Sequence, residues 1–126
     1  MIKILFADDE VIVRNLYSQS LRGIDGFEVE TASDGQEALE KIELFKPHLI
    51  ILDIFMPKKT GTEVLKAIKS NPDTKSLPVL MFSGVSDLKT ITECLELGAI
   101  GFIQKNEEHE EIIAKIKLLV RLQVKA

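Results

Sequence analysis

Short continuous runs of apolar residues alternate along this chain with longer segments whose apolar residues recur at helical spacing. Runs of strand length occur at residues 2–7, 49–52, 77–82 and 99–103, and residues 27–32 form a weaker, alternating one. Continuous runs of this length are typical of strands that are covered on both faces of a sheet. Strands that alternate with helices form parallel βαβ units, so the pattern predicts an α/β fold with helices on both sides of the sheet.

The segments between the runs have the apolar spacing of amphipathic helices. The expected buried side of the first helix carries Ile12, Val13, Leu16, Tyr17, Ser20 and Leu21. In the fourth helix, the residues expected to face inward, behind an N-cap at Ser86 or Asp87, are Leu88, Ile91 and Leu95. The last helix is expected over about residues 107–122, with a buried stripe of Ile112, Ile113, Ile116, Leu119 and Val120. Asp34, three residues before Glu37, predicts a capping box at the start of the second helix.

Length and composition narrow the class of protein. We expect one domain over residues 1–126, since domains usually run to about 100–150 residues. The net charge of −4 argues against direct nucleic-acid binding, which favours a basic surface. No apolar run approaches the roughly 20 residues that cross a bilayer, so we expect no membrane insertion. The single cysteine cannot form an internal disulfide, and a cytoplasmic location is expected.

Polar residues directly follow the predicted strands. Those after the first, third, fourth and fifth strands are Asp8, Asp9, Glu10, Asp53, Ser83 and Lys105. Ligands of open parallel sheets bind beyond the carboxyl ends of the strands. For a strand order of 2-1-3-4-5, these side chains share one edge of the sheet, which we expect to be the functional site.

The carboxylates at this edge repel one another. Two unit charges about 4 Å apart cost roughly 4 kcal/mol at an effective dielectric constant near 20. An all-oxygen cluster favours a hard cation, and a site with few protein ligands suits Mg²⁺. The alternative is that Asp9 and Glu10 only complement the positive end of a helix. That alternative does not explain Asp53, which follows four buried aliphatic residues.

Asp53 is the candidate nucleophile. A carboxylate beside a divalent cation can attack phosphorus, because the cation screens its charge from the phosphoryl oxygens. Those oxygens also need hydrogen-bond donors. Ser83 can supply a hydroxyl group and Lys105 an ammonium group.

The motifs resemble a known family at this point. Residues 7–10, 52–57 with Gly61, 82–84, 98–99 and 102–105 resemble the CheY-like receiver domain of bacterial two-component response regulators. The resemblance covers essentially the whole chain, and five motifs in order make it specific. It implies a flavodoxin-like (βα)5 fold, with strand order 2-1-3-4-5, and a phosphoryl group accepted from a phosphohistidine.

The resemblance also assigns roles. Asp53 corresponds to the phosphoacceptor, and the residues that correspond to the Mg²⁺ site are Asp8 (through water), Asp9, Asp53 and the backbone carbonyl of Phe55. Ser83 and Phe102 correspond to the switch hydroxyl and switch aromatic, and Lys105 to the phosphate-binding lysine. Phosphorylation would then remodel the surface of the fourth helix, fifth strand and fifth helix.

The expected function is a switch that acts by binding rather than as an enzyme. The resemblance implies a sensor histidine kinase or histidine phosphotransfer protein as phosphodonor, and a downstream protein target. The alternatives are a hydrolase with an aspartyl-phosphate intermediate, a non-phosphorylated adaptor of the same fold, and a receiver fragment of a larger regulator. Leu118 and Leu122 are expected to face outward together, as a partner contact or dimer surface or as a harmless pair.

Two departures from the family pattern carry predictions. The family usually has Pro after the lysine, commonly in a cis bond, whereas Asn106 follows Lys105 here. A cis bond costs about 3–4 kcal/mol for a residue other than Pro, so we expect a trans bond. Phe55 and Val85 occupy positions that flank the site and are often polar in the family, and we expect them to hinder attacking water and lengthen the phosphate lifetime.

Overall fold

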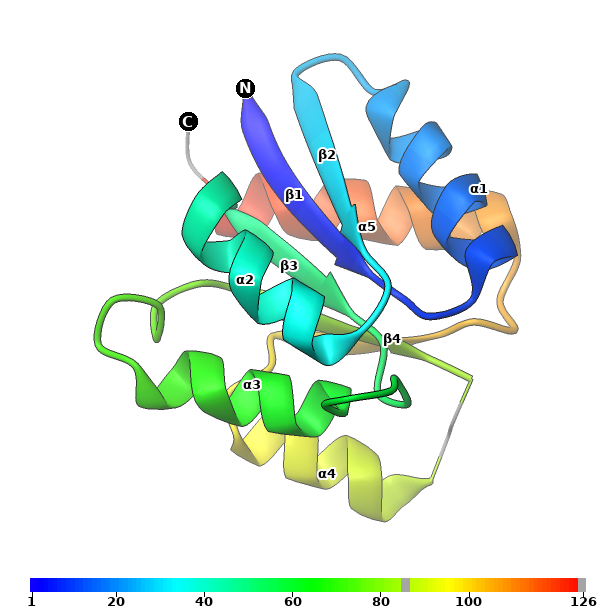
Figure 1. The fold of residues 1–126 in the computed structure, drawn as a ribbon. Helices are drawn as coiled ribbons and strands as arrows, with labels where there is room; N and C mark the ends of the chain where they lie inside the picture. The colour runs from blue at the N-terminus through cyan, green and yellow to red at the C-terminus, as the bar shows by residue number, and fades with distance from the viewer. Residues whose placement is uncertain (85–86, 125–126) are drawn as a thin grey trace.

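The computed structural model describes residues 1–84 and 87–124 as one parallel sheet with helices on both faces (Figure 1). The sheet has the strand order β2-β1-β3-β4-β5, and all four pairings are parallel. The strands are β1 (Ile2–Ala7), β2 (Phe27–Ala32), β3 (Leu49–Leu52), β4 (Val79–Ser83) and β5 (Gly101–Gln104). The helices are α1 (Val11–Arg22), α2 (Gly35–Phe45), α3 (Gly61–Ser70), α4 (Leu88–Glu96) and α5 (His109–Gln123). The predicted doubly wound α/β fold and strand order are confirmed.

Each face of the sheet has its own hydrophobic core. Helices α2, α3 and α4 cover one face, with buried residues such as Ile42, Leu65 and Cys94 against Ile50 and Leu52 of β3. Helices α1 and α5 cover the other face, where Tyr17, Leu21, Ile112, Ile116 and Val120 pack against a set that includes Phe6, Ile51 and Phe82. Successive side chains of a strand point to opposite faces, so the continuous apolar runs supply both cores.

The predicted strand bounds are confirmed for the first three strands, and the last two begin two residues later than expected. Leu77 closes a turn instead, since its N–H donates to the carbonyl of Thr74. Ala99 likewise lies in the turn that follows α4, because its N–H donates to the carbonyl of Cys94. Gly98 makes this helix end possible with a φ of 106°, a conformation that residues with a Cβ rarely adopt.

The expected buried side of α1 is wrong in part. Ile12 is 82% exposed and Leu16 is 46% exposed, while Tyr17, Ser18 and Leu21 are buried. The helix is rotated so that Tyr17 stacks against Phe6 of β1, with ring centroids 6.0 Å apart. Ser18 tolerates burial because its hydroxyl donates to the carbonyl oxygen of Asn15.

The inner face of α4 also differs from the prediction. Leu88 is 77% exposed and Leu95 is 47% exposed, whereas Cys94 is fully buried. Asp87 is the N-cap and accepts from the backbone N–H groups of Lys89 and Thr90. Leu88 is therefore the first residue of a short helix and does not reach the core. The alternative cap, Ser86, lies outside the described residues.

The remaining helix predictions agree more closely. Asp34 caps α2 by accepting from the N–H of Glu37, but the predicted capping box is incomplete, because the Glu37 carboxylate accepts from the N–H of Ser33 rather than from that of Asp34. Helix α5 starts at His109, slightly later than expected, and buries Ile112, Ile116 and Val120, with the other two stripe residues half-buried. Within the described residues, no helix is both long enough and apolar enough to cross a membrane.

Candidate functional site

The carboxyl ends of the strands place the site residues through backbone hydrogen bonds that continue the sheet. The N–H of Asp53 donates to the carbonyl of Ala7 at 2.9 Å, and the N–H of Asp8 donates to the carbonyl of Ala32 at 3.0 Å. The N–H of Lys105 donates to the carbonyl of Ser83 at 3.0 Å. The first residue beyond β1, β3 and β5 is thus fixed by the same ladder that holds the strands.

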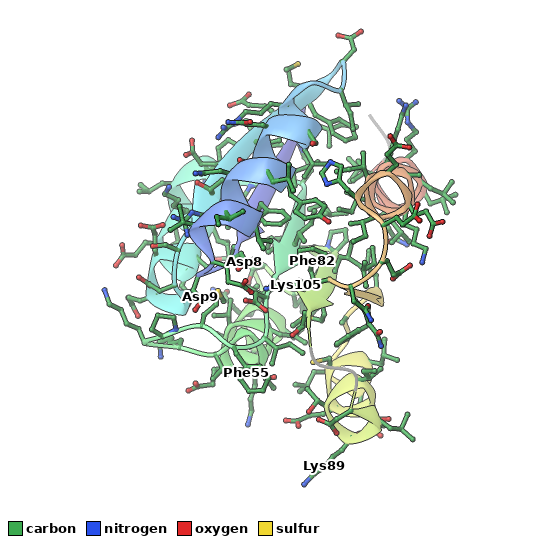
Figure 2. The ribbon with its side chains drawn as sticks, turned by 90° about the vertical axis from the view of Figure 1, so that its right-hand side faces the viewer. Asp8, Asp9, Phe55, Phe82, Lys89 and Lys105 are labelled. Carbon is green, nitrogen blue, oxygen red and sulfur yellow. The ribbon has the colours of Figure 1, made fainter. Side chains whose placement is uncertain are left out.

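Lys105 joins the ends of three strands through its ammonium group. Its Nζ lies 2.8 Å from Glu10 Oε1, 2.9 Å from Asp8 Oδ2 and 3.2 Å from Asp53 Oδ2. It also lies 5.8 Å from the centre of the Phe82 ring. Figure 2 shows Asp8, Asp9 and Lys105 close together at this edge of the sheet, with Phe55 on the loop that follows β3.

Four carboxylates converge beside this lysine. One oxygen each from Asp8, Asp9, Glu10 and Asp53 lies within 4.8 Å of the others. Asp8 and Asp53 are buried, while Asp9 and Glu10 are exposed. Among the described residues the cluster contains no His or Cys, so the donor set fits a hard divalent cation such as Mg²⁺.

Burial and the neighbouring charges shift the pKa values of the residues in this cluster. Burial, and then the charge of Asp8, raise the pKa of Asp53 from 3.8 to about 7, although Lys105 opposes the shift. Burial also raises the pKa of Asp8. Burial alone would lower the pKa of Lys105, but its hydrogen bonds to Glu10 and Asp8 and the charge of Asp53 raise it overall. The lysine is therefore a permanent cation beside a carboxyl group that titrates near neutral pH.

The structure brings together five residues that were expected at this edge of the sheet, namely Asp8, Asp9, Glu10, Asp53 and Lys105. Ser83 is buried at the end of β4 and connects to Lys105 through the backbone. Phe102 is half-buried on β5 and packs against the core under α2, α3 and α4. Phe55 is 58% exposed at the mouth of the site, and Val85 lies outside the described residues. No cis peptide occurs in the described ranges, so the expected trans bond before Asn106 is confirmed.

Three further residues support the site. Glu10 was expected at this edge and Gly61 belongs to one of the family motifs, whereas Arg14 was not predicted as part of the site. Glu10 makes the shortest contact with Lys105, and Arg14 donates from Nη1 to the carbonyl oxygen of Asp8 at 2.8 Å. A Cβ at Gly61 would lie 1.9 Å from the carbonyl oxygen of Asp53, so only glycine lets α3 start this close to β3. The place of Glu10 directly after Asp9 predicts it at this edge, whereas the contacts of Arg14 and Gly61 depend on how the helices pack.

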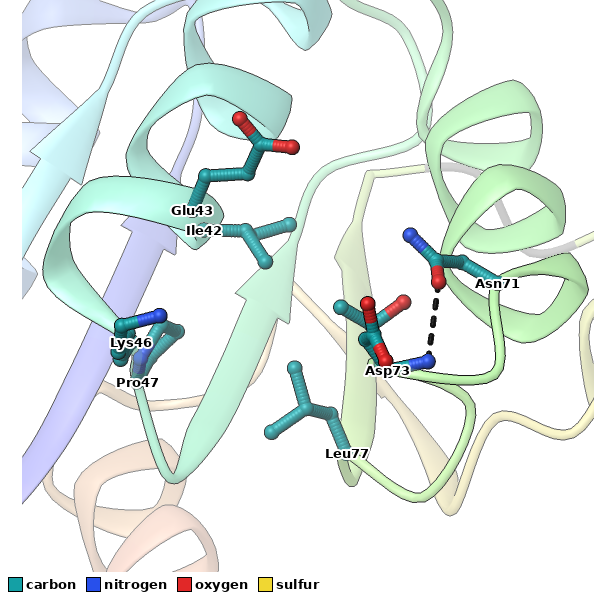
Figure 3. A pocket seen from close by; sticks show the side chains of 8 residues that line it. Ile42, Glu43, Lys46, Pro47, Asn71, Asp73 and Leu77 are labelled. Carbon is teal, nitrogen blue, oxygen red and sulfur yellow. Dashed lines mark hydrogen bonds between the residues drawn. The ribbon is translucent and has the colours of Figure 1, made fainter.

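A cavity of 390 Å³ lies far from this cluster, between α2 and the loop after α3 (Figure 3). It is lined in part by Ile42, Pro47 and Leu77, and the latter two precede β3 and β4. In its wall, Asn71 Oδ1 accepts from the N–H of Asp73 at 2.9 Å. The cavity therefore lies at the amino ends of the strands, and the acidic cluster at their carboxyl ends.

Comparison with known proteins gives consistent matches. A family model described as the response regulator receiver domain matches residues 4–117. The chain is 41% identical over 128 residues to the protein-glutamate methylesterase/protein-glutamine glutaminase of Clostridium acetobutylicum, covering 98% of this chain and 36% of that protein. It is 38% identical over 119 residues to the alkaline phosphatase synthesis transcriptional regulatory protein PhoP of Bacillus subtilis, covering 94% of this chain and 48% of PhoP.

A solved structure supports the same relationship. The chemotaxis protein CheY4 of Vibrio cholerae matches with a TM-score of 0.84 and 34% identity, covering 94% of this chain and 98% of the CheY4 chain. The chain thus spans about half or less of the two curated relatives but nearly all of CheY4.

Proposed function

Because the chain belongs to the family of response regulator receiver domains, we propose that Asp53 accepts a phosphoryl group from a phosphohistidine on a partner protein. A carboxylate oxygen of Asp53 attacks the phosphorus, and the O–P bond forms as the N–P bond breaks. The imidazole nitrogen keeps the bonding electron pair. The observation that carries this proposal is a buried carboxylate 3.2 Å from a permanent ammonium group within an acidic cluster.

The surrounding residues support the transfer in distinct ways. Asp8, Asp9, Asp53 and the backbone carbonyl of Phe55 would hold Mg²⁺, which when bound offsets the negative charge of the phosphoryl oxygens. Lys105 supplies a fixed cation to one of those oxygens, and Ser83 is proposed to donate its hydroxyl to another. Because Asp53 is buried, water has little access to the phosphorus, and the carboxylate of Asp53 rather than a water molecule is the attacking group.

The exposed apolar residues around the site support docking of the phosphodonor there. Ile12 and Leu16 lie on the solvent side of α1, and Phe55 lies on the loop after β3. A sensor histidine kinase or a histidine phosphotransfer protein would cover these side chains as it presents its phosphohistidine to Asp53. Exposed apolar groups beside a charged site are typical of such a contact surface.

We further propose that the chain acts through binding, with residues 1–126 as one receiver unit. The output surface would comprise α4, β5 and α5, where Leu118 and Leu122 are 59% and 61% exposed and offer a contact for a target or a second copy. The methylesterase activity in the name of one relative belongs to a protein of which this chain spans 36%, so we do not extend that activity to this chain.

The test is phosphorylation by a small phosphodonor with Mg²⁺, followed by intact mass. The wild-type chain and the exposed control Asp25→Asn should each gain one phosphate, and Asp53→Asn should gain none. The added mass should be released by hydroxylamine, which cleaves acyl phosphates. Absence of any gain in the wild type would support the adaptor alternative, and continuous release of phosphate with rapid turnover would support the hydrolase.

A further inference from the structure

Three carboxylates surround the Lys105 ammonium group, and Glu10 is the nearest. The Nζ atom lies 2.8 Å from Glu10, 2.9 Å from Asp8 and 3.2 Å from Asp53. An ammonium group has three N–H donors, one for each of these oxygens. While Asp53 is still a free carboxylate, an incoming phosphoryl oxygen can therefore bind Lys105 only by displacing one of them.

Exposure decides which carboxylate is displaced. The side chain of Asp8 is 0% exposed and that of Asp53 is 4% exposed, whereas that of Glu10 is 58% exposed. Removing a counter-ion from a buried carboxylate is costly, because the charge stays in a poor solvent. A released Glu10 carboxylate instead regains water at little cost.

The local backbone leaves the Glu10 side chain free for this role. Glu10 is the N-cap residue of α1, but its side chain makes no capping hydrogen bond. Its own backbone is fixed, since its N–H donates to Asp8 Oδ1 at 2.9 Å and its carbonyl accepts from the N–H of Arg14 at 2.9 Å. The backbone of Glu10 is thus held in place, and among the described residues its carboxylate contacts only Lys105.

We propose that Glu10 is a displaceable counter-ion of Lys105, a positioning residue that holds the ammonium over Asp53 until phosphoryl oxygens replace it. The proposal rests on the function proposed above. It has two consequences for anionic phosphoryl ligands. They must break the ion pair between Glu10 and Lys105, and they must approach a fourth negative charge at the mouth of the site. Glu10 therefore slows phosphorylation by anionic small molecules and weakens the binding of phosphoryl mimics.

The test compares Glu10→Gln with the wild type and with Glu28→Gln, which removes the same charge from β2, outside the acidic cluster. Rates are measured by intact mass with acetyl phosphate, a dianion, and with phosphoramidate, a monoanion near neutral pH. Glu10→Gln should react about fivefold faster with acetyl phosphate, equivalent to about 1 kcal/mol for a solvent-exposed ion pair. The gain should be smaller with phosphoramidate and should shrink at high salt.

Affinity for beryllofluoride with Mg²⁺, measured by calorimetry, gives a second readout. Glu10→Gln should bind this phosphoryl mimic several-fold more tightly, and Glu28→Gln should match the wild type. Equal rates and affinities in all three proteins, or slower phosphorylation of Glu10→Gln, would overturn the role of Glu10 and leave the function of Asp53 intact. If neither donor phosphorylates the wild type, both proposals fail.

Discussion

Replacing Asp53 with Asn should stabilise the metal-free protein. In the folded chain, burial and the neighbouring Asp8 raise the pKa of Asp53 from 3.8 to about 7. Asn keeps the shape of the side chain and can accept the hydrogen bond that Ile54 donates to Asp53 Oδ1 at 2.8 Å. Lys105 still retains Glu10 and Asp8 as partners. The substitution therefore removes a poorly solvated charge and keeps the hydrogen bond from Ile54, although it loses the contact of Asp53 with Lys105.

The magnitude follows from linkage between protonation and folding. A pKa that is higher in the folded state means that the folded chain binds the proton more tightly, so the free energy of unfolding falls as pH rises. The loss begins above 3.8 and is complete once pH exceeds about 7. At about 1.4 kcal/mol per pKa unit the full difference is about 4 kcal/mol. Because the Asn amide NH2 group would take the place of Oδ2 and cannot accept from Lys105, part of this gain is lost, and we expect Asp53→Asn to gain about 2–4 kcal/mol at mildly alkaline pH.

The assay is urea denaturation in the presence of a chelator, followed by far-ultraviolet circular dichroism over a series of pH values. The transition midpoint of Asp53→Asn should exceed that of the wild type at alkaline pH, with an unchanged slope, and the two should converge as pH falls toward 4. The exposed control Asp25→Asn should follow the wild type. Saturating Mg²⁺ should reduce the difference, because it binds the folded wild type. An Asn variant that is less stable than the wild type at every pH would refute the reasoning.

Further predictions concern the loop after β3 and the start of α3. Gly61→Ala should destabilise the fold by more than about 2 kcal/mol in denaturation and weaken phosphorylation, because its Cβ would lie 1.9 Å from the carbonyl oxygen of Asp53. Thr60→Ala should cost about 1 kcal/mol, since Thr60 and Glu63 form a complete capping box at the start of α3; an unchanged midpoint would contradict this. Phe55→Asn should shorten the phosphate lifetime measured by loss of added mass, because a polar side chain at the mouth can orient water; a lifetime equal to or longer than that of the wild type would count against it.

The sequence predicted the strands and the site for the same physical reason. A strand buried on both faces must be continuously apolar, so the charged residues that end such runs, Asp8 and Asp53, mark the sheet edge where ligands bind. The helices were less predictable. Ile12 and Leu88 fit a helical stripe, yet both are exposed, because the rotation of a helix depends on its partners and its cap rather than on its own pattern. The contact between Glu10 and Lys105 joins residues 95 positions apart, which no local pattern specifies.

The repulsion among the carboxylates destabilises the folded chain, and the same repulsion favours the binding of a cation. The sheet places the carboxyl groups of Asp8 and Asp53 in a buried position, with a lysine as their shared cation. A divalent cation would relieve the repulsion among these acids, whereas the proposed phosphorylation of Asp53 would replace one carboxylate charge with the larger negative charge of a phosphoryl group. The repulsion lowers the stability of the folded chain. A ligand that relieves it recovers part of this free energy on binding, so it binds the folded chain more tightly. A larger gain in stability from Asp53→Asn therefore implies a stronger tendency of the wild-type site to bind a divalent cation.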